Sequence, residues 1–337
     1  MKAPILVKSP TRVDLAGGTL DMWPLYSFLG SALTINLAID ICTHVEFKSR
    51  PHLGIKITSL DLKKDWEFSS IATFLGALDP HLHLYQKVFE KFCTELSNLP
   101  HGFEVTTSSE SPIGGGLGGS SSLVISILKA TYQLLDLKIP NPNELVHLAH
   151  NIEAQILKTP TGTQDYFPAV TGGLSFIDYS AVGIKQKVFP IAGTPFEDHF
   201  LLVYTGKSHQ SGLNNFEVLK SCVEGDQKVL SALQKIKSIA LGMQVCIEDK
   251  AWGDLPKLFQ MEYDARIELT PAFSSPEIEK LAKICVAAGA LAVKICGAGG
   301  GGCVLVWVPP SQRERVIQVC QNENFQCLNA RPVSPLN

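Results

Sequence analysis

Hydrophobic and polar positions alternate through most of the first third of the chain. Four stretches rich in β-branched residues show this period between turn residues: 5–18, 31–49, 53–61 and 102–110. Alternation of this kind is typical of strands with one buried face. Between the last two stretches, hydrophobic residues recur at helical intervals over 79–96. The pattern predicts a sheet with a helix packed against it.

Helical spacing dominates the middle of the chain. "SLVISILKATYQLLDL" predicts a helix from Ser122, and Pro140 and Pro142 interrupt the pattern after it. A second helix is expected over 143–157, with Asn143 as its N-cap. "TGGLSFIDYS" and "GIKQKVFPI" then predict a hairpin, and "DHFLLVYTG" predicts a buried strand that begins the second half.

The second half combines helices with a short apolar sheet. Residues 212–290 are predicted to be mostly helical, and "LAVKICGAGGGGCVLVWVPP" predicts two strands joined by a glycine cluster. A helix and then a strand are expected over 313–333. Because the sequence shows neither a repeat nor a low-complexity linker, it predicts a compact α+β chain with a domain boundary near 180–200.

Composition and charge narrow the classes of partner. The 337 residues are 45% hydrophobic, which is enough for an ordinary globular core, and the net charge is −3. A chain without excess positive charge is not expected to bind nucleic acid. Nine scattered cysteines form no CxxC pair, and no run of 18 apolar residues occurs. We therefore expect buried thiols in a cytoplasmic protein without a membrane segment.

A glycine-rich stretch, "SPIGGGLGGSSS", directly precedes the first predicted helix of the middle segment. Glycine allows close approach of backbone to a ligand, and N–H groups at a helix start bind phosphate oxygens. A tight loop with small packing residues explains an isolated example equally well. A hydroxyl beside phosphates also suits Mg²⁺, so Ser120 and a carboxylate elsewhere are candidate ligands.

Three other motif templates fit the sequence poorly. GxGxxG occurs twice, starting at Gly114 and Gly297, but neither match joins a strand directly to a helix. A dehydrogenase therefore remains only as a minor alternative. The P-loop template fails because Leu201 stands at its first glycine, and the GxSxG motif of serine hydrolases is absent.

Three segments, "RVDLAGGTLD", "PIGGGLGGSSS" and "KICGAGGGGC", together resemble the ordered motifs of the GHMP kinase superfamily. The first of them and "TGTQDYFPAVTGG" are similar to the branch that contains heptose 7-phosphate kinases and fucose kinases. The resemblance implies an N-terminal α+β domain with a left-handed βαβ unit over 1–190. It also implies a ferredoxin-like C-terminal domain over 191–337.

The resemblance assigns roles to residues of this chain. Asp165 would face the acceptor hydroxyl, and Arg12 would stabilise charge on the transferring phosphoryl or orient Asp165. Ser120 and Glu153 would hold Mg²⁺. The ATP-binding residues implied are Gly114, Gly115, Gly116, Leu117, Gly118, Gly119, Ser120 and Ser121. The substrate-binding residues implied are Asp21, Gly18, Thr19, Gly299 and Gly300. The family commonly has Ser or Thr at Gly119 and a bulky residue at Cys303.

Each assignment has a plainer alternative. Glu153 could be a solvated helix residue, Asp165 the cap of a short helix, Arg12 a surface residue with a salt bridge, and Asp21 a helix N-cap. His81 and His83 are expected at the surface. Residues 207–210 follow a buried strand, where loops often contact ligands, so they are further candidates.

The sequence therefore predicts an ATP- and Mg²⁺-dependent kinase that acts on a sugar or sugar phosphate, with a heptose 7-phosphate-like acceptor favoured. Two further alternatives remain open: a kinase of a non-sugar acceptor such as mevalonate or homoserine, and a catalytically silent sugar sensor. Neither a nucleic acid nor a membrane is an expected partner, and a homodimer is left open.

Overall fold

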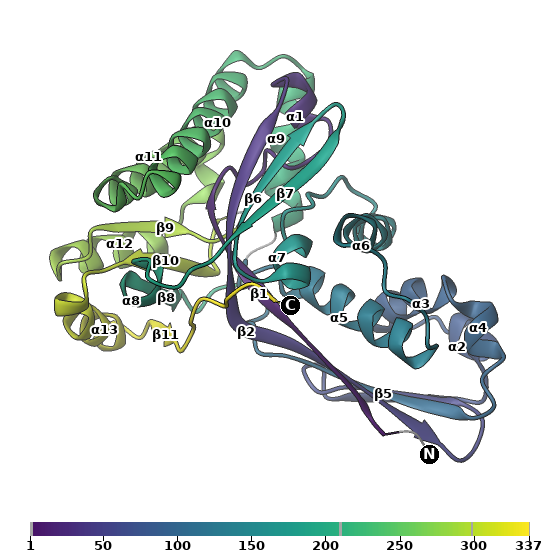
Figure 1. Cartoon of the computed structure of the whole chain (residues 1–337). Coiled ribbons are helices and arrows are strands. Elements are labelled where there is room, and N and C mark those ends of the chain that lie inside the picture. The colour runs from purple at the N-terminus through teal and green to yellow at the C-terminus, as the bar shows by residue number, and fades with distance from the viewer. Residues whose placement is uncertain (1–2, 209–210, 298, 337) are drawn as a thin grey trace.

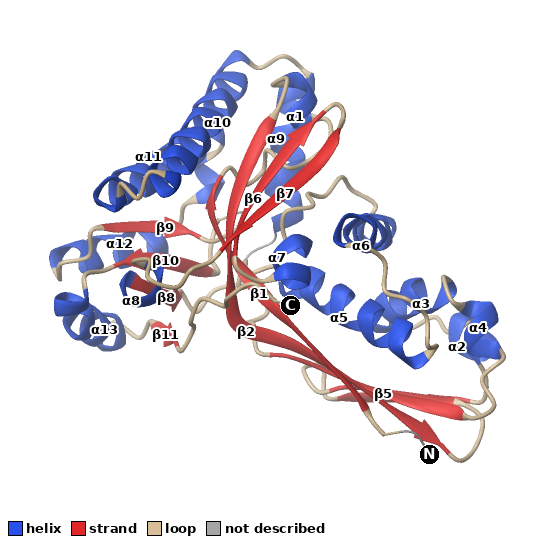
Figure 2. Cartoon of the chain, in the orientation of Figure 1, coloured by secondary structure: helices blue, strands red, loops and turns tan. Residues whose placement is uncertain are grey.

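Two β-sheets and their helices make up the computed structural model of the chain (Figure 1). The structure describes residues 3–208, 211–297 and 299–336, with backbone alone over 211–214. Helices and sheets occur together in both halves (Figure 2). The predicted α+β class is confirmed.

The first sheet has seven strands, and β2 is its longest member. They are β1 (Ile5–Ala16), β2 (Ala32–Arg50), β3 (Ile55–Ser59), β4 (Lys64–Phe68), β5 (Gly102–Ser109), β6 (Leu174–Ser180) and β7 (Gly183–Phe189). The order is β4-β3-β5-β2-β6-β7, with β1 paired to β2. Among the described strands of this sheet, only β3 and β5 pair in parallel, and the connection between them includes helices.

Both edges of β2 are used. β1 pairs along one edge, while β5 pairs with residues 43–50 and β6 with residues 32–37 on the other. Between those two pairings, residues 331–333 bond to β2 at Ala38 and Asp40. A segment remote in sequence therefore completes this edge.

The helices of the first half are short near the N-terminus and longer after the glycine loop. They are α1 (Leu25–Phe28), α2 (Ile71–Leu75), α3 (His83–Glu90), α4 (Cys93–Ser97), α5 (Gly119–Leu134), α6 (Pro142–Leu157) and α7 (Tyr166–Thr171), with a 3₁₀ turn at Pro80–Leu82. The helix predicted over 79–96 is thus divided into three pieces.

The predicted N-cap of α6 was wrong by two residues. The Asn141 side chain caps the helix by accepting a bond from the Glu144 N–H, and the Glu144 carboxylate accepts a bond from the Asn141 N–H. Pro142 occupies the first helical position, where its missing N–H is tolerated. Asn143 instead lies inside the first turn.

The second sheet has four antiparallel strands in the order β11-β8-β10-β9. These are β8 (Phe200–Tyr204), β9 (Ala292–Ile295), β10 (Cys303–Trp307) and β11 (Gln326–Leu328). The helices are α8 (Phe196–His199), α9 (Ser211–Val223), α10 (Gln227–Glu248), α11 (Leu255–Leu269), α12 (Pro276–Ala287) and α13 (Arg313–Asn322), with 3₁₀ turns at Trp252–Asp254, Pro271–Phe273 and Pro310–Gln312. From β8 onward this is the expected βαββαβ, ferredoxin-like arrangement.

Hydrophobic clusters of buried residues join the two sheets. In one of them, Val13 and Ile35 from the first sheet lie with Leu202 and Trp307 from the second and Met243 from α10. The first sheet ends at Phe189 and the second begins at Phe200; the division at residue 190 stays a prediction. All nine cysteines carry free thiols. Among the described residues, no helix combines the length and apolar character needed to cross a bilayer.

Candidate active site

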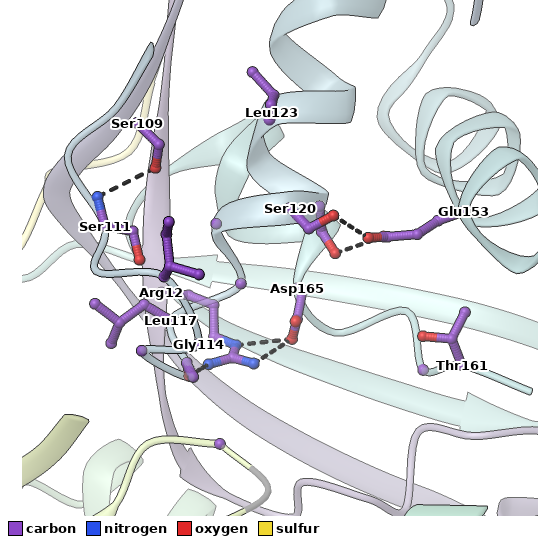
Figure 3. Close-up of a pocket in the computed structure, with 18 of the residues that line it drawn as sticks. Arg12, Ser109, Ser111, Gly114, Leu117, Ser120, Leu123, Glu153, Thr161 and Asp165 are labelled. Atoms are coloured by element: carbon purple, nitrogen blue, oxygen red, sulfur yellow. Dashed lines mark hydrogen bonds and ion pairs between the residues drawn. The ribbon is translucent and has the colours of Figure 1, made fainter. Parts of the chain in front are cut away.

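A cavity of about 510 Å³ lies where the glycine loop meets β1 and the starts of α5 and α7 (Figure 3). Its lining includes Arg12, Asp21, Ser120, Glu153 and Asp165, which lie in four separate stretches of the sequence. Arg266 and Gly297 contribute from the second half of the chain. The structure therefore brings most of the predicted site residues to one place.

The glycine loop turns three times before α5 begins. Gly114, Gly116 and Gly118 have φ of 66°, 74° and 71°, a region that side chains disfavour. The helix starts at Gly119, earlier than the predicted Ser122, and its first bond runs from Ser122 N–H to Gly118 O at 2.9 Å. The N–H groups of the first turn precede that bond, and N–H groups in this position at a helix start can bind an anion.

Neighbouring segments fix the shape of this loop. The Arg12 N–H donates to Leu117 O at 3.0 Å, and the Cys303 N–H donates to Gly115 O at 2.7 Å. The Leu117 side chain itself is buried in the core. A Cβ at Gly119 would lie 3.3 Å from Ser111 Oγ, so the Ser111 hydroxyl adjoins this position closely. Ser111, the first residue of the glycine-rich stretch, also lines the cavity, although it was not among the predicted site residues.

Arg12 connects the loop to Asp165. Its Nε and Nη2 donate to Asp165 Oδ1 at 2.8 and 2.6 Å. Its Nη1 donates to Gly116 O at 2.5 Å and to Cys296 O at 2.8 Å. The side chain is 5% exposed, so the surface alternative for Arg12 is wrong. The Arg12 guanidinium therefore bonds to the glycine loop at Gly116, to Cys296 after β9, and to the Asp165 carboxylate.

Glu153 accepts hydrogen bonds from three hydroxyls. Ser120 Oγ donates to Oε1 at 2.5 Å, Ser121 Oγ donates to Oε2 at 2.8 Å, and the Tyr166 hydroxyl also donates to Oε2. Glu153 is 6% exposed, which excludes the solvated alternative. Burial and the nearby Glu153 charge raise the pKa of Tyr166 well above its usual value, so this tyrosine remains a donor.

Asp21 also lines the cavity, next to residues 162–164. Its Oδ2 accepts the Gln164 N–H at 3.0 Å, and a Cβ at Gly162 would clash with the same carboxylate. Burial, with repulsion from Asp165 and Asp14, raises the pKa of Asp21 to about 6. Since α1 begins only at Leu25, Asp21 is not its N-cap.

A buried ion network near Asp21 was not predicted from the sequence. Arg266 forms ion pairs with Asp14 and with Glu262, and its Nε lies 2.7 Å from Glu262 Oε1. Lys294 Nζ lies 3.3 Å from Glu262 Oε2 and donates to the backbone oxygen of Asp14 at 2.6 Å. All four side chains are almost inaccessible. A Cβ at Gly18 would fall 1.9 Å from Arg266 Nη2, so this glycine makes room for the pair. Charged residues inside apolar strands, as in "AVKI", were the available signal.

Other predicted residues lie elsewhere or make different contacts. Thr19 lines the cavity and donates to Asn215 Oδ1 at 3.1 Å. Gly18, Gly299 and Gly300 are absent from the cavity lining, and Gly299 packs against the Phe273 backbone.

The candidates after β8 are only partly described. Lys207 pairs with Glu277 at 2.5 Å. The candidates His209 and Gln210 lie outside the described residues. Asp165 directly precedes α7, but its side chain forms no capping bond.

Family models match both halves of the chain. The model described as GHMP kinases N terminal domain matches residues 83–173, and the one described as GHMP kinases C terminal matches residues 243–326. Together they match half of the sequence. The chain belongs to the GHMP kinase family. It is therefore an enzyme of the small-molecule kinase class.

Relatives within the GHMP kinases differ in their acceptors. A D-glycero-alpha-D-manno-heptose 7-phosphate kinase of Campylobacter jejuni is 27% identical over 95% of this chain and 94% of its own length. A mevalonate kinase of Thermococcus onnurineus is 25% identical over 92% of this chain and 91% of its own length.

Solved structures of GHMP kinases resemble the fold of this chain over almost its whole length. The crystal structure of a D-glycero-D-manno-heptose 1-phosphate kinase from Bacteriodes thetaiotaomicron superposes with a TM-score of 0.78 and 22% identity, over 99% of this chain and 97% of that one. At this identity the likeness shows the GHMP kinase fold alone.

Proposed function

We propose that this enzyme transfers the γ-phosphoryl group of ATP, with Mg²⁺, directly to a hydroxyl of a sugar or sugar phosphate. A heptose 7-phosphate-like acceptor is favoured by the similarity to the Campylobacter jejuni enzyme. The observation that carries the proposal is the position of Asp165. A Cβ at Gly118 would lie 3.2 Å from Asp165 Oδ2, so the carboxylate adjoins the glycine loop in the cavity that Asp21 also lines.

The glycine loop is the proposed nucleotide site. Residues 114–121 would surround the triphosphate with backbone N–H groups, and the start of α5 adds a favourable dipole. The Ser111 hydroxyl would add a donor near Gly119, where the family commonly has a hydroxyl of its own. The proposed division places this loop in a domain over 1–190 and β8–β11 in a domain over 191–337.

The residues around Ser120 fit a magnesium ion. Mg²⁺ prefers hard oxygen ligands and keeps several waters, so it needs few protein groups. Ser120 Oγ and Glu153 Oε1 are 2.5 Å apart, and both residues line the cavity beside the loop. Bound there, the ion would neutralise charge on the phosphates.

Asp165 and Arg12 are the proposed catalytic residues. Asp165 would accept or orient the proton of the acceptor hydroxyl, and Arg12 would hold the carboxylate and stabilise charge on the phosphoryl. Phosphoryl transfer needs alignment and charge stabilisation more than covalent chemistry. We therefore infer direct transfer without a phosphoenzyme.

Asp21 is proposed to bind acceptor hydroxyls, with Thr19 beside it. Gly18 would act by keeping the Asp14–Arg266 pair intact, and Gly299 and Gly300 by shaping the loop next to Gly297. The Asp21 carboxylate accepts a bond from the Gln164 N–H, and an ionised carboxylate can accept further bonds from hydroxyl donors. The acceptor site thus supports a polyol.

An ADP-release assay tests the proposal. Heptose 7-phosphate, fucose, galactose, mannose and mevalonate would each be supplied with ATP or GTP and Mg²⁺. We expect turnover with a sugar or sugar phosphate. If mevalonate were the only compound phosphorylated, the proposed sugar acceptor would be wrong, and the acceptor would match that in the name of the Thermococcus relative. Ligand-induced thermal shifts without ADP release would instead indicate a silent sensor.

A further inference from the structure

Residues 331–336 leave the second half of the chain and attach to the first sheet. After β11 the trace runs to a point beside α7 and β1 (Figure 1). Asp40 N–H donates to Arg331 O at 2.9 Å, Arg331 N–H donates to Asp40 Oδ1 at 2.7 Å, and Val333 N–H donates to Ala38 O at 2.9 Å. The segment fills the stretch of β2 between its pairings with β6 and β5.

The same segment also holds the turn that follows α7. Gly173 N–H donates to Val333 O at 2.9 Å, and Leu336 N–H donates to Thr171 O at 2.7 Å. A Cβ at Gly172 would lie 2.6 Å from Ser334 O, and φ is 63° there. Because both the contact and the dihedral exclude a side chain, the turn is shaped to receive the segment.

These bonds reach the end of the helix that begins after Asp165. α7 has only six residues, and its last carbonyls need partners from outside the helix. Leu336 N–H satisfies Thr171 O, while Lys129 Nζ from α5 donates to Ala169 O and Val170 O at 3.2 and 3.4 Å. Such a short helix depends on these contacts for its position.

The segment also bonds to the strand residue that is paired with Arg12. Ala38, which accepts the Val333 N–H, is the cross-strand partner of Arg12 in the β1–β2 pairing. The register of that pairing shifts between Pro10 and Thr11, next to Arg12. One segment therefore contacts both the strand partner of Arg12 and the helix that follows Asp165.

We propose that residues 331–336 form a positioning strap that holds Arg12 and Asp165 in the alignment required for phosphoryl transfer. The strap residues do not line the cavity, so they act through Ala38 and α7 rather than on the substrate. The inference rests on the proposed function, because it assigns catalytic roles to those two residues. A displacement of about 1 Å at a reacting group can reduce the rate by about 10²-fold.

The test compares two substitutions at one position in the full chain. Val333→Pro removes the N–H that bonds to Ala38 O, whereas Val333→Ala keeps it. We expect Val333→Pro to lower kcat at least tenfold with KM for ATP changed less than twofold, and Val333→Ala to stay within twofold for both. Hydrogen exchange should accelerate in α7 and at Ala38 and Gly173 in Val333→Pro, and remain unchanged in α10.

Leu336→Pro gives an independent second variant, since it removes the bond to Thr171 O. Unchanged kcat in both proline variants, despite faster exchange in α7, would overturn the strap. So would unchanged exchange in α7. If the unsubstituted chain phosphorylated no acceptor, the proposed function would fail, and the exchange measurement would still decide by itself whether the segment holds α7.

Discussion

Arg12 directs two N–H groups to one oxygen of Asp165 and leaves the other oxygen beside Gly118. The bonds from Nε and Nη2 to Oδ1 are 2.8 and 2.6 Å long. Within the described residues Oδ2 accepts no hydrogen bond, and the Asp165 side chain is 25% exposed. The arginine thus fixes the carboxylate without occupying the oxygen nearest the glycine loop.

Asp165→Asn should abolish most phosphoryl transfer. The amide can still accept bonds from Arg12, but it cannot take a proton from the acceptor hydroxyl. We expect kcat to fall by about 10³-fold, in the range typical of a lost general base. ATP affinity, measured by calorimetry, should change little. A variant that keeps a tenth of the activity would contradict this role.

Arg12→Lys tests the geometry rather than the charge. A lysine ammonium cannot reach Asp165 Oδ1, Gly116 O and Cys296 O with the fork that arginine uses. We expect about 10²-fold loss in kcat. Arg50→Lys, at an exposed pair with Glu67, provides the control and should retain full activity.

Glu153→Gln should raise the Mg²⁺ concentration needed for half-maximal activity by about tenfold, because it removes the negative charge beside Ser120. The shape of the side chain is retained. Glu144→Gln, in the cap of the same helix, is the matched control and should leave the Mg²⁺ dependence unchanged. An unaltered magnesium curve in Glu153→Gln would remove Glu153 from the metal site.

Asp21→Asn should stabilise the protein while weakening the acceptor interaction. The pKa of Asp21 rises from 3.8 to about 6 on folding, so the folded state binds the proton more tightly. The resulting stability is present below pH 3.8 and is lost as the pH rises through 6. Asparagine avoids that loss, and urea unfolding should show a gain of up to about 3 kcal/mol at pH 7.5 that vanishes near pH 3.8.

The same substitution tests the acceptor site. If ionised Asp21 accepts bonds from acceptor hydroxyls, kcat/KM for the acceptor should decline below about pH 6 in the unsubstituted enzyme. Asp21→Asn should lower kcat/KM and remove this inflection. An acceptor KM unaffected by the change would place the acceptor elsewhere.

Local sequence patterns predicted where helices and strands occur better than they predicted which distant residues come into contact. The glycine loop, both sheets and the main helices follow from short-range periodicity and turn residues. The sequence also contains the signal for the N-cap of α6. Asn141 and Glu144 have the spacing of a capping box, and Pro142 stands at the first helical position. Asn143 has the residue type of a cap, but the proline at position 142 already occupies the first helical turn.

Long-range pairs for which the family resemblance implied no role could not be predicted from one sequence. Asp14 and Arg266 are separated by 252 positions, and neither flanking segment indicates which charge it will meet. The segment 331–336 likewise has the extended character expected of a strand, but only Gln326–Leu328 joins the second sheet. Where an extended segment docks depends on which edge is left open, and that is a property of the whole fold.

Gly18→Ala should destabilise the protein severely, because the new Cβ would fall 1.9 Å from Arg266 Nη2 and 2.0 Å from Asp14 Oδ2. Separating a buried ion pair leaves uncompensated charge and costs about 3–5 kcal/mol. Urea unfolding should show that loss. Gly253→Ala, where a Cβ meets nothing within 4 Å, should change stability by less than about 0.5 kcal/mol. If both variants unfolded alike, the Asp14–Arg266 pair would not be what requires glycine at position 18.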